Sequence, residues 1–212
     1  MSDASSAPRT GVVLAGGYST RFGDRDKALA AIDGDPMLVR VVRRLASVVD
    51  EVVVSCRADQ HEEFEREIDG LAAPTPVRFV HDSTPDMGPL AGIKNAFEGT
   101  ESEITAVVAC DMPWVDPAFL SALFDRVGDA EALVPEHPDG HLQPTQAVYR
   151  TAAMRQVAGD QLAAGNRSVH RALDQLDMTV LSAATVADLS DTTTLRDVNT
   201  VAERDAYEGT SE

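Results

Sequence analysis

Short runs of apolar residues alternate along this chain with stretches in which apolar residues recur every three or four positions. A short continuous apolar run is typical of a strand buried on both faces, whereas the longer spacing is typical of a helix with one buried face. We expect strands at 11–15, 52–54, 77–80, 104–110, 132–134, 146–149 and 178–181. We expect helices that open at Pro36, cover 59–68, follow segment 88–92 as far as Phe97, cover 152–163 and 168–176, and begin after Thr200.

This alternation predicts an α/β fold in which a mostly parallel central sheet is covered by helices on both faces. The chain shows no repeat and no linker, so we expect a single domain at 11–207, a short lead-in at 1–10 and a frayed tail at 208–212. In such a sheet a ligand lies beyond the carboxyl ends of the strands. That rule predicts that Gly16–Gly17, Asp82 and Asp111 lie along one edge.

The segment from Leu14 to Lys27 has the clearest chemical signal. Its sequence, LAGGYSTRFGDRDK, directly follows the first expected strand. Glycines let backbone N–H groups approach a phosphate, and Arg21 and Lys27 add positive charge. The segment has neither the GK pair of the Walker loop nor the GxGxxG of dinucleotide-binding loops. We interpret it as a phosphate-binding loop of another kind; the alternative is a plain strand-to-helix turn with solvated charges.

Charge is the unusual feature of the composition. The chain has 35 acidic residues against 18 Lys and Arg, giving a net charge of -17. Such a surface repels nucleic acid and anionic membranes, so neither is an expected partner. Lys27 and Lys94 are the two lysines; the other basic residues are arginine. An acidic, lysine-poor surface predicts a halophilic protein, because high salt screens its self-repulsion.

Cysteine and histidine usage argues against a transition-metal site. Cys56 and Cys110 form neither a disulfide framework nor a zinc pattern, and the five histidines show no ligand spacing. Both cysteines follow apolar runs, so we expect them to be reduced and packed in or near the core. The N-terminus lacks an apolar signal-peptide core and no apolar run is long enough to cross a bilayer, which makes the cytoplasm the expected location.

The Leu14–Lys27 segment resembles the LAGGxSxRxGxDK motif of molybdenum cofactor guanylyltransferases, within the nucleotidyltransferase superfamily. Further segments resemble motifs of that family in the same order: GPLAG at 88–92, CDMP at 110–113, QPT at 143–145 and DVNT at 197–200. The resemblance extends over nearly the whole chain. It implies a Rossmann-like three-layer sandwich. It also implies a reaction in which the terminal phosphate of molybdopterin attacks the α-phosphorus of GTP and releases pyrophosphate, with Mg2+ as cofactor.

The catalytic residues expected on this basis are Arg21, Lys27 and Asp111. Asp111 ends the longest apolar run, so its carboxylate should emerge at the sheet edge, where a hard oxygen ligand suits Mg2+. The alternative for Asp111 is a helix N-cap before Pro113. Lys27 and Arg21 should stabilise the charge of the transition state and of the departing pyrophosphate.

For the nucleotide, the resemblance assigns Leu14, Ala15, Gly16, Gly17, Lys27, Ser55, Asp82 and Asp111. Asp82 matches the family's nucleotide-contacting aspartate after the third strand, although Asp-Ser is also common turn chemistry. Ser55 falls where relatives often carry asparagine, and the shorter hydroxyl leaves that contact open. Gly16 stands where cytidylyl-transferring relatives commonly carry alanine, and the missing methyl group favours GTP over CTP.

On the acceptor side, the resemblance assigns Gln143, Asn166, Arg167 and Asn199. Their side chains can donate to a pterin edge or a phosphate. The loop at 165–168 is equally consistent with a helix cap. Trp114 and Tyr149 are candidates to line the acceptor cleft, but packing in the core or on the surface is the better interpretation. The expected partners are GTP and molybdopterin as substrates, with transient contacts to proteins of molybdenum cofactor metabolism.

Two other functions remain open from the sequence. The first is a nucleotidyltransferase with another phosphorylated acceptor, such as a sugar phosphate, phospholactate or cobinamide phosphate, because the loop recognises the triphosphate and not the acceptor. The second is a nucleotide-binding protein without chemistry. The presence of both Lys27 and Asp111 argues against the second, since a protein that only binds could lose either residue.

Overall fold

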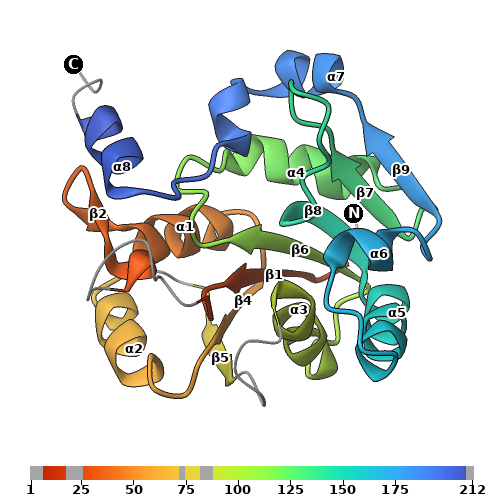
Figure 1. The fold of residues 1–212 in the computed structure, drawn as a ribbon, viewed down its shortest axis with the longest axis horizontal. Helices are drawn as coiled ribbons and strands as arrows, with labels where there is room; N and C mark the ends of the chain where they lie inside the picture. The colour runs from red at the N-terminus through yellow and green to blue at the C-terminus, as the bar shows by residue number, and fades with distance from the viewer. Residues whose placement is uncertain (1–6, 18–25, 72–74, 82–87, 209–212) are drawn as a thin grey trace, which may run out of the picture.

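A computed structural model describes residues 7–17, 26–71, 75–81 and 88–208 of the chain. Within these residues a seven-stranded sheet has the order β5–β4–β1–β6–β8–β7–β9 (Figure 1). The strands are β1 Arg9–Leu14, β4 Glu51–Cys56, β5 Val77–His81, β6 Ile104–Ala109, β7 Ala132–Pro135, β8 Gln146–Arg150 and β9 Met178–Leu181. Of these strands, β8 alone runs antiparallel to its neighbours. The mostly parallel central sheet predicted from the sequence is confirmed.

The central strands are buried on both faces because alternate side chains enter two separate hydrophobic clusters. Val12 and Val53 belong to one cluster, whereas Val13, Val52 and Val54 belong to the other. One face is covered by α1 Met37–Ala46, α2 His61–Asp69, α4 Pro117–Arg126 and α7 Ala183–Leu189. The other is covered by α3 Pro89–Glu98, α5 Thr151–Ala163 and α6 Val169–Leu173 (Figure 1). This arrangement is the expected three-layer sandwich.

Several boundaries differ from those predicted. The first strand begins at Arg9 rather than Gly11, because the Arg9 N–H donates to the Asp50 carboxylate at 2.8 Å and residues 9 and 10 pair in the sheet. Helix α2 begins at His61 rather than Asp59. Helix α6 ends at Leu173 rather than Leu176, with Ser168 as its N-cap.

Helices α4 and α7 were not predicted. Helix α4 has clear start signals, since the Asp116 side chain accepts from the Ala118 N–H at 2.8 Å and Pro117 takes the first helical position. Helix α7 starts in the same way at Ser182, whose hydroxyl accepts from the Thr185 N–H at 3.3 Å. Both helices pack on the first cluster, α4 through Phe119 among others.

A small hairpin and the C-terminal segment pack together beside the sheet. Strands β2 Ala31–Ile32 and β3 Asp35–Pro36 are joined by Asp33 and Gly34, both with positive φ. This pair has the conformation of a tight two-residue hairpin turn. Ile32, Met37 and Val198 form a third small cluster. The 3-10 helices η1 Lys27–Leu29 and η2 Thr192–Leu195 and the helix α8 Val201–Glu208 complete the described elements.

None of the helices in the described ranges is both long and apolar enough to cross a membrane.

Candidate active site

A cavity of about 530 Å³ opens at the carboxyl ends of β1, β4 and β6. In the sheet, β4 and β5 lie on one side of β1, and β6 and the later strands lie on the other side. The cavity therefore lies at the switch point where α/β sheets bind their ligands. Its walls are formed by Leu14–Gly17, Asp26–Ala28, Ser55, Gly88, Pro89, Gly92, Ala109–Met112, Gln143, Thr145 and Asp197.

Lys27 lines the cavity, and its ammonium group lies between two other residues that the sequence predicted for the site. The residue begins η1, which is capped by the Asp26 carboxylate accepting from the Ala28 N–H at 3.0 Å. Lys27 Nζ donates to Asp111 Oδ2 at 2.7 Å and to Asn199 Oδ1 at 2.9 Å. The ion pair is largely shielded from solvent, with 15% of the Lys27 side chain and 25% of the Asp111 side chain exposed.

Asp111 lies just beyond the end of β6. The Cys110 N–H donates to the Leu14 carbonyl at 3.0 Å, which ties this segment to the end of β1. The Val198 N–H donates to the Asp111 carbonyl at 2.8 Å. The alternative role of Asp111 as a helix cap is wrong, because the nearest helix is capped by Asp116.

The Cys110 thiol lines the same cavity. Burial, reinforced by the charge of Asp111, raises the pKa of this thiol well above its ordinary value. The side chain is therefore a neutral thiol at physiological pH.

Asn199 is held by its own loop. Its Nδ2 donates to Asp197 Oδ2 at 2.8 Å, and its backbone N–H donates to Glu203 Oε2 at 2.6 Å. Glu203 Oε2 also accepts from the Thr200 N–H at 3.0 Å, and the Glu203 N–H donates to Thr200 Oγ1 at 3.1 Å. This reciprocal capping box starts α8 and fixes the residue that contacts Lys27.

Helix α3 approaches the cavity closely because of two glycines in the GPLAG segment. Gly88 has φ +77°, a conformation that favours glycine, and Pro89 takes the first turn of the helix. A Cβ atom at Gly92 would lie 2.9 Å from Ser55 Oγ and 3.3 Å from Leu14 Cδ2. Ser55 is buried, so the short hydroxyl side chain fills the narrow space between β4 and α3.

The structure brings most of the predicted residues together. Leu14, Ala15, Gly16, Gly17, Lys27, Ser55, Asp111 and Gln143 line the cavity. Asn199 contacts Lys27 directly. Arg21 and Asp82 lie outside the described residues.

Two predicted acceptor residues are not among the lining residues. Asn166 donates to Gln161 Oε1 at 3.0 Å and accepts from Arg171 at 2.8 Å. Arg167 has an exposed side chain, and its backbone carbonyl lies beside Gly88. The segment at 165–168 ends in the Ser168 cap of α6, as its alternative interpretation expected.

The aromatic residues and the second lysine have structural surroundings. Tyr149 is fully buried in the core, where its hydroxyl donates to the Pro144 carbonyl at 2.6 Å. Trp114 packs against the small cluster around Ile32. Lys94 forms an ion pair with Glu98 on α3 at 2.5 Å and does not line the cavity.

Four residues at the site were not singled out from the sequence. Asp197 lines the cavity, and it lies inside the DVNT segment that the sequence did point to. Asp26, Arg57 and Gln60 form a polar network under the glycines. Arg57 and Gln60 have no signal in the sequence, because they reach the glycines only through the packing of β4 beside β1.

Comparison with known proteins identifies the family. Residues 11–180 match the family described as the MobA-like NTP transferase domain. The chain is 42% identical to a protein of Natronomonas pharaonis named probable molybdenum cofactor guanylyltransferase, over 82% of this chain and 83% of that protein. The chain belongs to this family. It is also 37% identical to the molybdenum cofactor guanylyltransferase of Burkholderia ambifaria, over 80% of this chain and 83% of that protein.

Solved structures support the fold of this MobA-like nucleotidyltransferase. The molybdopterin-guanine dinucleotide biosynthesis protein A of Archaeoglobus fulgidus superposes with a TM-score of 0.76 at 23% identity, covering 94% of this chain and 96% of that one. A nucleotidyl transferase from Methanothermobacter thermautotrophicus superposes with a TM-score of 0.72 at 19% identity, covering 94% and 97%. The relatives from Natronomonas pharaonis and Haloferax mediterranei are haloarchaeal, which agrees with the halophilic character predicted from the acidic composition.

Proposed function

We propose that this chain transfers GMP from GTP to molybdopterin and releases pyrophosphate, giving a guanine dinucleotide cofactor. The observation that carries the proposal is the position of Lys27 Nζ, which contacts both Asp111 and Asn199. The cavity beside it is lined in part by Leu14–Gly17, the start of the Leu14–Lys27 segment, which we call the glycine loop. The names of relatives that are 42% and 37% identical over four fifths of the chain support the same reaction.

The chemistry requires one bond to form and one to break at the α-phosphorus. An oxygen of the molybdopterin phosphate forms the new P–O bond, and the bond to the oxygen that bridges the α- and β-phosphates breaks. The electron pair of that bond leaves on pyrophosphate. Lys27, and Arg21 beyond the described residues, would stabilise the negative charge that builds up on these oxygens. Positioning and electrostatics carry most of such a transfer, so an acid or base side chain is not required.

The oxygen donors of the cavity fit a divalent cation. Asp111 and Asp197 bring carboxylates to the lining of the cavity. Among the described residues no three His, Cys, Asp or Glu side chains are arranged to hold a metal by themselves. Two carboxylates suit Mg2+, which takes one or two of them and completes its shell with phosphates and water. Bound through Asp111, the ion would neutralise phosphate charge and orient the α-phosphate.

The nucleoside would occupy the part of the cavity between the glycine loop and α3. Leu14, Ala15, Gly16 and Gly17 present backbone and small side chains there, and Ser55 closes the floor against Gly92. A purine base can approach such a surface closely. Gly16 is the position on which the preference for guanine depends, and Asp82 is the further proposed nucleotide contact.

The acceptor would lie on the side of Gln143 and Asn199. Gln143 lines the cavity and donates to the Leu195 carbonyl at 3.2 Å, and Asn199 contacts Lys27. Both amides can bind a phosphate or a pterin edge. Asn166 and Arg167 would contribute only to the outer part of a bound acceptor, since neither lines the cavity.

The test is an acceptor panel. The purified chain receives GTP labelled at the α-phosphate, Mg2+ and, in separate reactions, molybdopterin, phospholactate, cobinamide phosphate and a sugar 1-phosphate. The proposal predicts label in the dinucleotide product with molybdopterin alone. Transfer to one of the other acceptors with none to molybdopterin would assign the chain to another nucleotidyltransferase reaction. Binding of GTP without transfer to any acceptor would indicate a nucleotide-binding protein without chemistry.

A further inference from the structure

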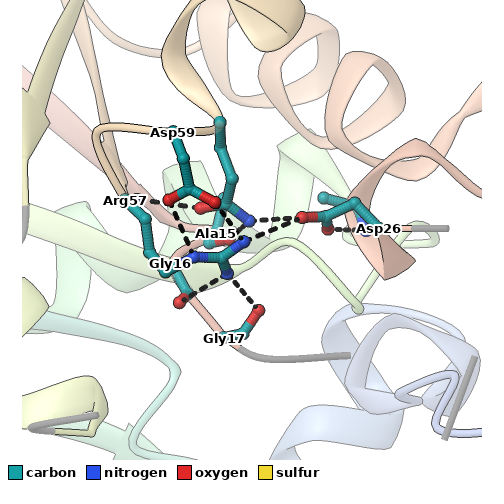
Figure 2. A network of polar contacts seen from close by, with 8 residues as sticks. Ala15, Gly16, Gly17, Asp26, Arg57 and Asp59 are labelled. Carbon is teal, nitrogen blue, oxygen red and sulfur yellow. Dashed lines mark hydrogen bonds and ion pairs between the residues drawn. The ribbon is translucent and has the colours of Figure 1, made fainter. Parts of the chain in front are cut away.

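Arg57 and Gln60, in the turn between β4 and α2, donate hydrogen bonds to the backbone of the glycine loop. Arg57 Nη1 donates to the Gly16 carbonyl at 3.3 Å and to the Gly17 carbonyl at 3.0 Å (Figure 2). Gln60 Nε2 donates to the Ala15 carbonyl at 3.3 Å. Three consecutive carbonyls of the loop are therefore bound by one short segment about 40 residues further along the chain.

The same two residues also hold the far end of the loop at Asp26. Gln60 Nε2 donates to Asp26 Oδ2, and Arg57 Nη2 lies 3.7 Å from the same oxygen. The other oxygen of Asp26 caps η1, whose first residue is Lys27. Arg57 and Gln60 thus connect the glycines at the start of the loop with the carboxylate that precedes its lysine. We call Asp26, Arg57 and Gln60 the loop clamp.

The Arg57 guanidinium is engaged at every nitrogen. Nε and Nη2 donate to the two oxygens of Asp59 at 3.1 and 3.2 Å, while Nη1 donates to the two glycine carbonyls. The hydrogen bonds from Arg57 lower the pKa of Asp59. The side chain of Arg57 is 13% exposed. We therefore interpret Arg57 as a residue that fixes the loop backbone and not as one that binds a phosphate itself.

The clamp determines which way the loop amides point. In a planar trans peptide the carbonyl of one residue and the N–H of the next point in opposite directions. Since the carbonyls of Ala15 and Gly16 are turned toward the clamp, the N–H groups of Gly16 and Gly17 are turned away from it. Backbone N–H groups that share one side of a glycine turn make an anion-binding site.

We propose that Arg57 and Gln60 are positioning residues for triphosphate binding: they orient the Gly16 and Gly17 amides toward the phosphates and place Lys27 beside them through Asp26. The proposal rests on the proposed function, because it assigns a role at the same nucleotide site. It predicts a larger loss of affinity for GTP than for guanosine, because guanosine has no phosphates to contact the Gly16 and Gly17 amides.

The experiment measures the affinity of four variants for GTP with Mg2+ and for guanosine by calorimetry. Arg57→Lys keeps the charge but loses the fork, and Gln60→Met keeps the approximate length, adds no charge and loses both donor hydrogen bonds. The matched controls are Arg43→Lys, which alters an exposed ion pair with Asp35, and Gln156→Met, which removes an exposed hydrogen bond to Asp160. We expect the Kd for GTP to rise about tenfold in both clamp variants, which corresponds to about 1.4 kcal/mol of binding free energy.

The Kd for guanosine should rise by clearly less than the Kd for GTP, and the controls should change neither. An equal loss of GTP and guanosine affinity would overturn the proposal, because it would show a general distortion of the cavity. Clamp variants that bind GTP as well as the controls would also overturn it. The proposed function fails separately, when the unmodified chain itself does not transfer GMP to molybdopterin.

Discussion

Lys27 Nζ lies 2.7 Å from Asp111 Oδ2, although the two residues are 84 positions apart in the chain. The sheet explains the contact. Strands β1 and β6 are parallel neighbours in which Leu14 is paired with Ala109, so the segments that follow them leave the sheet at the same point. Lys27, 13 positions after Leu14, lies beside this point, and β6 continues directly into Asp111. One cation and one carboxylate therefore meet in the cavity to which the proposed function assigns the metal-bound triphosphate.

Replacing Asp111 by asparagine should remove metal-dependent turnover while leaving the fold intact. The amide keeps the size of the side chain but is a much weaker ligand for Mg2+. We expect kcat to fall by about a hundredfold or more, on the scale seen when a charge-stabilising group is removed from an active site. Turnover at increasing Mg2+ concentrations and the melting temperature should be measured together. Undiminished turnover would refute the assignment of Asp111 to the metal.

The charge of Lys27 should act in the transition state. In a Lys27→Met variant we expect kcat at saturating GTP to fall by about a hundredfold, because the ammonium would stabilise charge that develops during transfer. Steady-state kinetics with GTP as the varied substrate provide the measurement. A rise in KM with an unchanged kcat would show instead that Lys27 only binds the ground state.

The capping box of α8 should influence catalysis without contacting substrate. Glu203→Ala removes the acceptor for the Asn199 and Thr200 N–H groups. We expect the free energy of unfolding to fall by about 1 kcal/mol, typical of a lost helix cap, and kcat to fall severalfold as Asn199 loses its fixed position beside Lys27. Glu203→Gln, which keeps an acceptor oxygen, should restore most of both. Full activity in Glu203→Ala would show that the box serves α8 alone.

Two Gly→Ala changes should have opposite effects on stability, one at the contact between α3 and β4 and one in α5. At Gly92 the new methyl group would meet Ser55 Oγ at 2.9 Å, so we expect a loss of about 1–3 kcal/mol from overpacking. At Gly159 in α5 the nearest atom would be Lys94 Cε at 3.9 Å, so alanine should stabilise the helix by about 0.5–1 kcal/mol. Chemical denaturation of both variants measures the difference. Equal effects would contradict the tight packing at Gly92.

High salt should stabilise the fold. A net charge of -17 produces self-repulsion, which dissolved ions screen over about 3 Å at 1 M salt. We expect the melting temperature to rise steadily from dilute buffer to molar KCl. A melting temperature and an activity that are the same in dilute buffer and in multimolar KCl would argue against salt adaptation.

The sheet could be predicted well from the sequence because its strands are buried on both faces. The runs around Val13, Val53 and Val107 contain mainly apolar residues, and short runs of this kind are typical of strands in the middle of a parallel sheet. Helix α4 was missed although Asp116 and Pro117 are an ordinary start signal. The short β2–β3 hairpin was missed because its strands are too short to show a pattern.

The site was predictable only in the parts that are contiguous in the chain. The glycine loop and the CDMP segment are recognisable as short sequence motifs, and these motifs contain Lys27 and Asp111. The loop clamp could not be predicted, since Arg57 and Gln60 act on carbonyls about 40 residues away through the pairing of β4 with β1. Asn166 and Arg167 were assigned to the acceptor from their segment alone, and the structure places neither among the cavity's lining residues.

Nucleotide selection decides whether this chain acts as a guanylyltransferase. The measurement is kcat/KM for GTP, CTP, ATP and UTP with molybdopterin and Mg2+, following the dinucleotide product and pyrophosphate together. We expect one pyrophosphate for each dinucleotide and a preference for GTP of at least about tenfold over each of the other nucleotides. A preference for CTP, or pyrophosphate release without dinucleotide, would contradict the proposed reaction.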